Sequence, residues 1–348
     1  MSITKTSFGT HPDGSTVELF HLDNGQGLRC AIMTLGGIIT ELHVPGRDGS
    51  TADIALGLPT LQGYLDGHPH LGALTGRVAG RINGASFTLD GKKITLAAND
   101  EPNHLHGGPE GIDKRNWQAT ADDSDPQNPT LVLKYHSPDG EMGYPGNVDF
   151  TVTYRLTADN AVEIQYQAVT DAATPISLTN HSYFNLRGEG SPDLSGHELQ
   201  VLTDTIVPKL DCGTLTDTPA PVEGTPHDFR SPKSLKAFAD LGQHGEHYVL
   251  RAKDIAEPEL AAVVTEQESG RKMEVFTTAT AVQLYTSQTL AEAEVTGKSG
   301  KTYSDYSAFC LECQGYPNGV NAPEIDDIIL KPGETYRQTT RYKFSTLA

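Results

Sequence analysis

Val162-Glu163-Ile164-Gln165-Tyr166-Gln167-Ala168 is the stretch that decides the fold, because its apolar residues take every second position. Successive side chains of a β-strand point to opposite faces of a sheet, so this pattern predicts a strand with one buried and one wet face. The chain contains six similar segments, at residues 130–135, 150–156, 272–276, 282–285, 308–314 and 342–344. We therefore expect a protein built mainly of short β-strands.

The turn-forming residues support this expectation. The chain has 348 residues, and its 35 glycines and 21 prolines are spread along the whole length, as in proteins with many strands joined by turns. Residues 122–129 and 219–226 are rich in turn formers, but no change of composition flanks them, so we interpret them as loops. An all-β sandwich often exceeds 200 residues as one unit. The prediction is one all-β domain over residues 1–348, a large antiparallel β-sandwich with a few short helices.

Two short helices are predicted. Ser231 is placed as the N-cap and Pro232 as the first helical residue of a helix that runs to Ala239, with Gly242 beyond its end. A second helix is expected at residues 61–65, after Pro59 and Thr60. Both are too short to serve as the crossover of a parallel α/β unit, so a doubly wound sheet is disfavoured.

Charge and cysteine content narrow the function classes. With 26 basic and 45 acidic residues the net charge is −19, which disfavours binding to nucleic acid or to an anionic membrane surface. Residues 1–14 are polar, and no apolar run approaches the roughly 20 residues of a spanning helix. The four cysteines, Cys30, Cys212, Cys310 and Cys313, are too sparse for a disulfide scaffold. We expect reduced thiols and a cytoplasmic location.

The 13 histidines are the first candidates for chemistry near neutral pH. His106 and His181 lie among polar, turn-forming neighbours. If residues 104–106 form a strand, His104 and His106 share one face and offer two ligands to a metal, but nothing in the sequence specifies a third ligand. The alternative is a pair of histidines hydrogen-bonded beside a glycine turn. We expect no metal.

Cys310-Leu311-Glu312-Cys313 has the spacing of a redox or zinc half-site, yet it lies in an apolar strand and no second such pair exists. Period two places Cys310, Glu312 and Gln314 on one face and Cys313 on the other, so the two sulfurs diverge. Glu312 either faces solvent or lies in a cleft, where partial desolvation raises its pKa toward that of a useful base.

Gly76-Arg77-Val78-Ala79-Gly80-Arg81 presents two arginines beside glycines, which suits guanidinium contacts to hydroxyls or carboxylates. No phosphate-binding GxxxxGK[ST] loop and no GxSxG nucleophile motif occurs in the chain. Nucleotide and serine-hydrolase chemistry therefore have no support.

In their order along nearly the full chain, these segments resemble the aldose 1-epimerase, or galactose mutarotase, family. The resemblance is carried by seven motifs, at residues 36–37, 76–81, 105–108, 113–117, 137–146, 179–186 and 309–314. It implies the family's large antiparallel supersandwich with an open sugar cleft, in agreement with the strand pattern. It also implies interconversion of the α and β anomers of free aldohexoses such as galactose and glucose, with no cofactor and no metal.

The resemblance assigns roles by motif position. Glu312 corresponds to the general base and His181 to the general acid that open and close the sugar ring. Arg81 and His106 correspond to residues that bind the sugar and steady charge on the ring oxygen. Gln283 matches a further hydroxyl contact, and Tyr183, two residues after His181, is expected to line the same cleft.

Two departures from the family pattern affect the expected sugar contacts. The family usually has an aspartate where this chain has Glu246, before His247; the carboxylate is kept, one methylene longer, and we expect it to bind the sugar. Many members have asparagine where this chain has Gly80, so one hydroxyl contact is expected to be missing. His104 varies among relatives and receives no role.

Three rival functions fit the sequence less well. A hexose-6-phosphate 1-epimerase needs extra cations in the cleft to bind the phosphate. A silent sugar-binding module has no need of both His181 and Glu312, and a generic β-sandwich interaction domain leaves the seven motifs unexplained. We expect a monosaccharide as the only partner, with no nucleic acid and no membrane, in a monomer or homodimer.

Overall fold

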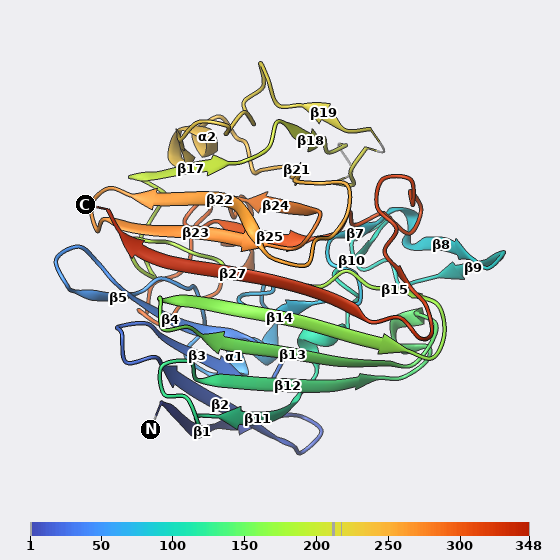
Figure 1. Ribbon diagram of the computed structural model, residues 1–348, viewed down its shortest axis with the longest axis horizontal. Coiled ribbons are helices and arrows are strands. Elements are labelled where there is room, and N and C mark those ends of the chain that lie inside the picture. The colour runs from blue at the N-terminus through green and yellow to red at the C-terminus, as the bar shows by residue number, and fades with distance from the viewer. Residues whose placement is uncertain (1, 211–212, 217, 348) are drawn as a thin grey trace.

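The largest layer is an antiparallel sheet of nine strands, which faces the viewer in Figure 1. The computed structural model describes residues 2–210, 213–216 and 218–347. In spatial order the sheet contains β11 (Gln118–Asp122), β12 (Thr130–Ser137), β13 (Val148–Leu156), β14 (Ala161–Thr170), β27 (Tyr336–Thr346), β23 (Arg271–Thr277), β22 (Glu259–Glu266), β17 (His197–Val201) and β20 (Lys233–Ser234).

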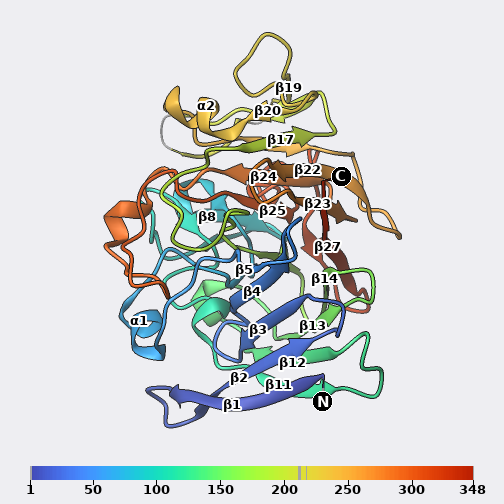
Figure 2. The same cartoon turned by 90° about the vertical axis from the view of Figure 1, so that its left-hand side faces the viewer.

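Two five-stranded antiparallel sheets cover one face of this layer, as Figure 2 shows. The first contains β1 (Ile3–Thr10), β2 (Thr16–Asp23), β3 (Arg29–Met33), β4 (Ile39–Pro45) and β5 (Thr51–Asp53). The second contains, in spatial order, β19 (Ala220–Pro221), β18 (Thr205–Val207), β21 (His247–Val249), β24 (Ala281–Tyr285) and β25 (Cys310–Gln314). One hydrophobic core lies between the three sheets. The all-β sandwich prediction is confirmed.

Short two-stranded pairs and 3₁₀ turns join the layers. The pairs are β8 (Ser86–Leu89) with β9 (Lys92–Thr95), β10 (His104–Leu105) with β7 (Arg81–Ile82), β16 (Thr179–Asn180) with β6 (Leu74–Thr75), and β15 (Thr174–Pro175) with β26 (Ile329–Leu330). The 3₁₀ turns are η1 (Asn83–Ala85), η2 (Ile112–Lys114), η3 (Glu141–Gly143) and η4 (Leu290–Ala293).

The alternating stretch Val162–Ala168 forms most of β14, near the middle of the nine-stranded sheet. In β14, Ile164 and Tyr166 are buried in the core, whereas Gln165 and Gln167 on the other face are exposed. Glu163 breaks the alternation because it is also buried, and it forms an ion pair with Arg155 of β13 at 3.3 Å. All seven predicted segments are strands, but β14 and β27 run to 10 and 11 residues and are longer than expected.

One helix is predicted correctly and one begins elsewhere. α1 (Leu61–Asp66) starts after Thr60, whose side chain accepts a hydrogen bond from the Gly63 amide. α2 (Leu235–Asp240) is capped by Ser234, not by Ser231, so the predicted start is wrong. Lys233 and Ser234 instead pair with β17, because sheet hydrogen bonds satisfy their backbone groups before the helix begins.

The remaining predictions concern loops and cysteines. Residues 123–129 form a loop as expected, but β19 occupies two residues of the loop expected at 219–226. Cys30, Cys310 and Cys313 are free and buried, while Cys212 lies outside the described residues. Within the described ranges, no helix is long and apolar enough to cross a membrane.

Candidate active site

A cavity of about 460 Å³ opens beside β24 and β25 and gathers most of the predicted site residues. Ligand cavities in proteins commonly have volumes of roughly 300–1,000 Å³. Six of the seven predicted side chains line it: Arg81, His106, His181, Tyr183, Gln283 and Glu312. They come from five separate segments of the chain, so only the tertiary structure brings them together.

His181 is held by the backbone of the segment around residue 72. It directly follows β16, and its N–H donates to the Ala73 carbonyl at 2.8 Å while its own carbonyl accepts from the Gly72 N–H at 3.0 Å. The neighbouring Asn180 side chain donates to the Gly72 carbonyl at 2.8 Å. The polar motif around His181 therefore fixes the direction of the imidazole.

His106 and Gly80 hold each other in place. The His106 N–H donates to the Gly80 carbonyl at 3.0 Å, and the Gly80 N–H donates to His106 Nδ1 at 3.1 Å. His106 has φ 52° and lies outside the two-residue strand, so the condition for a face shared with His104 is not met. His104 instead contacts the Ala97 carbonyl through Nδ1 at 2.7 Å.

The glycines of these motifs are required by close backbone contacts. A Cβ on Gly107, at φ +87°, would lie 1.7 Å from the Gly76 carbonyl oxygen. A Cβ on Gly80, at φ +76°, would lie 2.6 Å from Pro317 Cγ. The chain thus needs glycine at position 80, because Pro317 occupies the space that a side chain would take.

Glu312 lies in the middle of β25, where it pairs in register with Gln283 of β24. Its side chain is almost fully buried, and Oε2 lies 3.6 Å from His181 Nε2. Cys310, on the same face of β25, has its sulfur 3.6 Å from His181 Nδ1, whereas Cys313 packs in the main core. The predicted divergence of the two cysteines is confirmed.

Burial shifts the pKa values of Glu312 and His181 in opposite directions. It raises the pKa of Glu312 to about 8, an increase that the charges of Lys209 and Arg81 reduce. Burial also lowers the pKa of His181 to about 3, assisted by the nearby His70. At neutral pH the free protein therefore holds one proton on this pair, and that proton resides on the carboxyl group.

His106 is a hydrogen-bond donor toward the cavity and not a ready metal ligand. Burial lowers its pKa well below the usual value, so the ring is neutral. Because Nδ1 accepts from Gly80, the remaining hydrogen is on Nε2. Ligand atoms of His106, His181 and Glu312 lie within 4.8 Å of one another, but a cation on Nε2 would displace this hydrogen.

The two arginines of the motif at 76–81 have different roles. Arg81 lines the cavity and its Nε donates to Asp100 Oδ2 at 2.7 Å, in an ion pair that is about one-third exposed. Arg77 is buried away from the cavity and donates to Ser137 and to the carbonyls of Pro138 and Pro145. Arg77 therefore stabilises the protein's own loops.

Tyr183 and Gln283 form further parts of the cavity wall. The Tyr183 ring stacks on the His181 imidazole, with ring centroids 5.0 Å apart. Burial raises the pKa of Tyr183 well above its usual value, so its hydroxyl stays protonated. The Gln283 amide nitrogen donates to the Leu284 carbonyl at 2.6 Å, which fixes the orientation of the side chain.

Glu246, the seventh predicted site residue, does not line the cavity. Its Oε2 accepts a hydrogen bond from the Lys209 backbone N–H at 3.0 Å, and its Oε1 lies 3.7 Å from His227 Nε2. The carboxylate is turned to the protein's own backbone, and Lys209 lines the cavity next to it. The expectation of a direct sugar contact from Glu246 therefore has no geometric support.

Several cavity residues were not predicted from the sequence. His70 lines the cavity, its ring is tilted against that of His106 with centroids 4.7 Å apart, and it contacts the fully buried Asp113 at 3.1 Å. The sequence marks Asp113 only as part of the motif at residues 113–117. Tyr285 shares a strand face with Gln283, so alternation predicts its position. Lys209 lies in a loop, where no pattern marks it.

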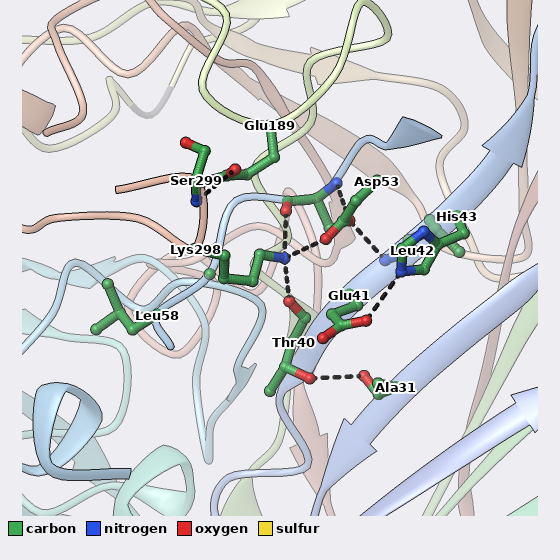
Figure 3. A network of polar contacts seen from close by, with 12 residues as sticks. Ala31, Thr40, Glu41, Leu42, His43, Asp53, Leu58, Glu189, Lys298 and Ser299 are labelled. Carbon is green, nitrogen blue, oxygen red and sulfur yellow. Dashed lines mark hydrogen bonds and ion pairs between the residues drawn. The ribbon is translucent and has the colours of Figure 1, made fainter. Parts of the chain in front are cut away.

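A second cluster of polar side chains lies on the first five-stranded sheet, away from the cavity (Figure 3). Ligand atoms of Glu41, His43 and Asp53 lie within 4.8 Å of one another. Asp53 is already paired with Lys298 at 2.6 Å, and Glu41 with His43 at 2.9 Å. Each charged group has a partner within the protein, so this cluster is structural.

Comparison with known proteins identifies the class. The chain matches the aldose 1-epimerase family over residues 18–343 and belongs to that family. Among individual relatives it is 43% identical to the galactose mutarotase of Rattus norvegicus, over 99% of both chains. It is 38% identical to the aldose 1-epimerase of Escherichia coli strain K12, over 96% of both chains.

Solved structures agree with this assignment. An aldose epimerase homologue from C. elegans superimposes with a TM-score of 0.85 at 28% identity, covering 95% of this chain and 100% of its own. The predicted family and fold are confirmed.

Proposed function

We propose that this protein is an aldose 1-epimerase, an isomerase that interconverts the α and β anomers of free aldohexoses such as galactose and glucose. The observation that carries the proposal is the buried pair of Glu312 Oε2 and His181 Nε2, 3.6 Å apart in the wall of one cavity. Distances slightly beyond hydrogen-bond length are common in ligand-free acid–base sites. The family membership and the named relatives support the same activity.

Ring opening requires removal of the proton on the anomeric hydroxyl and delivery of a proton to the ring oxygen. In the proposed mechanism the Glu312 carboxylate accepts the first proton and the His181 imidazolium donates the second. The bond between C1 and the ring oxygen breaks, the aldehyde forms, and rotation about the C1–C2 bond exposes its other face. The reverse transfers close the ring and restore both groups, so protons balance over the cycle.

The reactive form holds the shared proton on His181. Because burial favours the neutral pair in the free protein, sugar binding must support transfer of that proton from Glu312 to His181. Lys209 and Arg81 favour the ionised carboxyl electrostatically. The Nε2–H of His106 is a fixed donor for charge that develops on the ring oxygen, which is the kind of contact that lowers a barrier without reorganisation.

The rival functions fit the cavity less well. A hexose phosphate brings about two negative charges, and Arg81 is already engaged with Asp100. A silent sugar-binding module has no reason to bury an acid and a base together, since burial of such groups lowers stability.

The proposal extends to domain organisation, partners and location. The core shared by three sheets supports a single domain over residues 1–348, and the net charge of −19 supports a monosaccharide and no nucleic acid or membrane as partner. The free, buried Cys30, Cys310 and Cys313 support a reducing, cytoplasmic location. We keep a monomer or homodimer, working without a cofactor, as the prediction.

Polarimetry tests the activity directly. Freshly dissolved α-D-galactose and α-D-glucose should reach the equilibrium rotation faster with the protein than in a buffer blank. The absence of acceleration with either sugar, in protein shown to be folded by circular dichroism, would refute the proposed function.

A further inference from the structure

Lys209 is a cation in the wall of the active-site cavity to which the family resemblance assigns no role. It follows β18 by two residues and shares the cavity with Arg81 and Glu312. Its side chain is partly buried, and its backbone N–H donates to Glu246 Oε2 at 3.0 Å. Lys209 thus lines the cavity, whereas Glu246, which was expected to contact the sugar, does not.

The two cations of the cavity differ in how they are paired. Arg81 donates to both oxygens of Asp100, at 2.7 and 3.3 Å, so its charge is neutralised within the protein. Across residues 2–210, 213–216 and 218–347, the Lys209 ammonium has no ion pair within 4.0 Å and no hydrogen bond. Three N–H donors are therefore available to a ligand.

The Lys209 backbone is held in place from behind. Glu246 Oε2 accepts from the Lys209 N–H at 3.0 Å, and the Glu246 carbonyl accepts from the Leu284 N–H at 3.0 Å. Leu284 lies in β24 beside Gln283, so the Lys209 loop is tied to a strand of the active site. Glu246 acts here as a positioning residue for the lysine.

The Lys209 ammonium is only partly compensated, because the Glu246 and Glu312 carboxyl groups attract it without forming an ion pair within 4.0 Å. Charged groups with such incomplete compensation cluster at functional sites. A single ammonium matches a single carboxylate, whereas a phosphate carries about two charges and requires more donors. The charge in this cavity therefore favours a monoanionic substituent.

We propose that Lys209 is a specificity-determining residue that binds an acidic group of the substrate, so that the cavity accepts hexuronic acids as well as neutral aldoses. The proposal rests on the aldose 1-epimerase function proposed above. A hexuronic acid has the same anomeric carbon and ring oxygen as its parent sugar, so Glu312 and His181 perform the same ring opening.

The test compares two sugars that differ only at C6, D-galacturonate and D-galactose. The quantity measured by polarimetry is the ratio of kcat/KM for galacturonate to kcat/KM for galactose. In Lys209→Met this ratio should fall about tenfold or more relative to the unmodified protein, as expected for loss of a charge-assisted hydrogen bond. Lys209→Arg keeps the positive charge and should retain most of the ratio.

The matched control is Lys236→Met, which removes the same charge from the exposed surface of α2, where Lys236 pairs with Asp240. It should leave the ratio unchanged. Equal ratios in the unmodified protein and folded Lys209→Met would overturn the proposal. If Lys209→Met lost activity toward glucose 6-phosphate alone, the proposal would be overturned in favour of a phosphate substrate.

Failure of the proposed function has a different signature. If the unmodified protein accelerates neither galactose nor galacturonate, the epimerase function itself is wrong. If it accelerates galactose and the ratio does not respond to Lys209, only the specificity proposal is wrong. Melting temperatures of all three variants establish that each is folded.

Discussion

At the scale of single residues, the central feature is one proton shared by Glu312 and His181. At neutral pH Glu312 is protonated and His181 is neutral in the free protein, because burial favours the uncharged form of each. A carboxyl group and an imidazole with such shifted pKa values can exchange roles readily, which suits a reaction that runs in both directions.

Removing either partner should abolish most turnover and leave the fold intact. His181→Ala and Glu312→Gln should each lower kcat by roughly 10² to 10⁴-fold, the usual contribution of a general acid or base. Polarimetry gives kcat, and thermal melting reports on the fold. Glu41→Gln and His43→Ala are matched controls, since they alter a half-exposed pair of the same residue types at 2.9 Å. Unchanged kcat in either active-site variant would contradict its assigned role.

The pH dependence should follow the shared proton. The pair keeps one proton between the His181 pKa of about 3 and the Glu312 pKa of about 8. Above about pH 8 Glu312 loses that proton, no acid remains for the ring oxygen, and kcat/KM should fall. Measurement of kcat/KM with galactose across this pH range, corrected for spontaneous mutarotation, checks the prediction. A decline that begins near pH 4 to 5, the ordinary range of a glutamate, would show that Glu312 is not shifted.

At the scale of elements, the connection between β24 and β25 joins two strands that both carry site residues. Within it, Lys298 donates to the carbonyls of Thr40 and Ala55 and pairs with Asp53 at 2.6 Å (Figure 3). Ser299 adds a hydrogen bond from its N–H to Glu189 at 3.2 Å. The Lys298 contacts fasten the connection to β4 and β5.

Lys298→Met should therefore destabilise the protein by about 3 kcal/mol, because it leaves Asp53 with an uncompensated, mostly buried charge. Urea unfolding measures the loss. The double variant Lys298→Met with Asp53→Asn removes the stranded charge as well and should recover part of the stability. A double variant that is less stable than Lys298→Met would contradict the electrostatic explanation.

At the scale of the whole molecule, one hydrophobic core joins the three large sheets. It includes Phe20 of the first sheet, Tyr166 of the nine-stranded sheet and Leu284 of the last. No large sheet can lose its partner without exposing this shared surface to water.

We therefore expect one cooperative unfolding transition. In differential scanning calorimetry the calorimetric and van't Hoff enthalpies should agree, as they do for a single cooperative unit. Two resolved transitions, or limited proteolysis that releases a stable fragment, would instead indicate two domains.

Much of the fold and of the site was predictable from local patterns. Alternation identified strands such as β14, because burial on one face imposes a period of two wherever a strand forms. Motif order identified Glu312, His181, His106 and Arg81, and all four line the cavity. The start of α2 was not predictable, because Ser231 and Ser234 are both good caps and pairing with β17 selected between them.

What only the tertiary structure decided is which side chains reach the cavity and in which charge state. Lys209 lines the cavity and Glu246 does not, and a hydrogen bond from the Lys209 N–H, across 37 positions of sequence, holds the Glu246 carboxylate on the backbone. The pKa values of Glu312 and His181 likewise depend on burial, which is a property of the packed molecule. The sequence by itself determined the strands and the family, since periodicity and motifs are local, and it supplied the prediction of the acid–base pair. Electrostatics and cavity shape arise from contacts between distant segments, so they emerge only when the chain is folded.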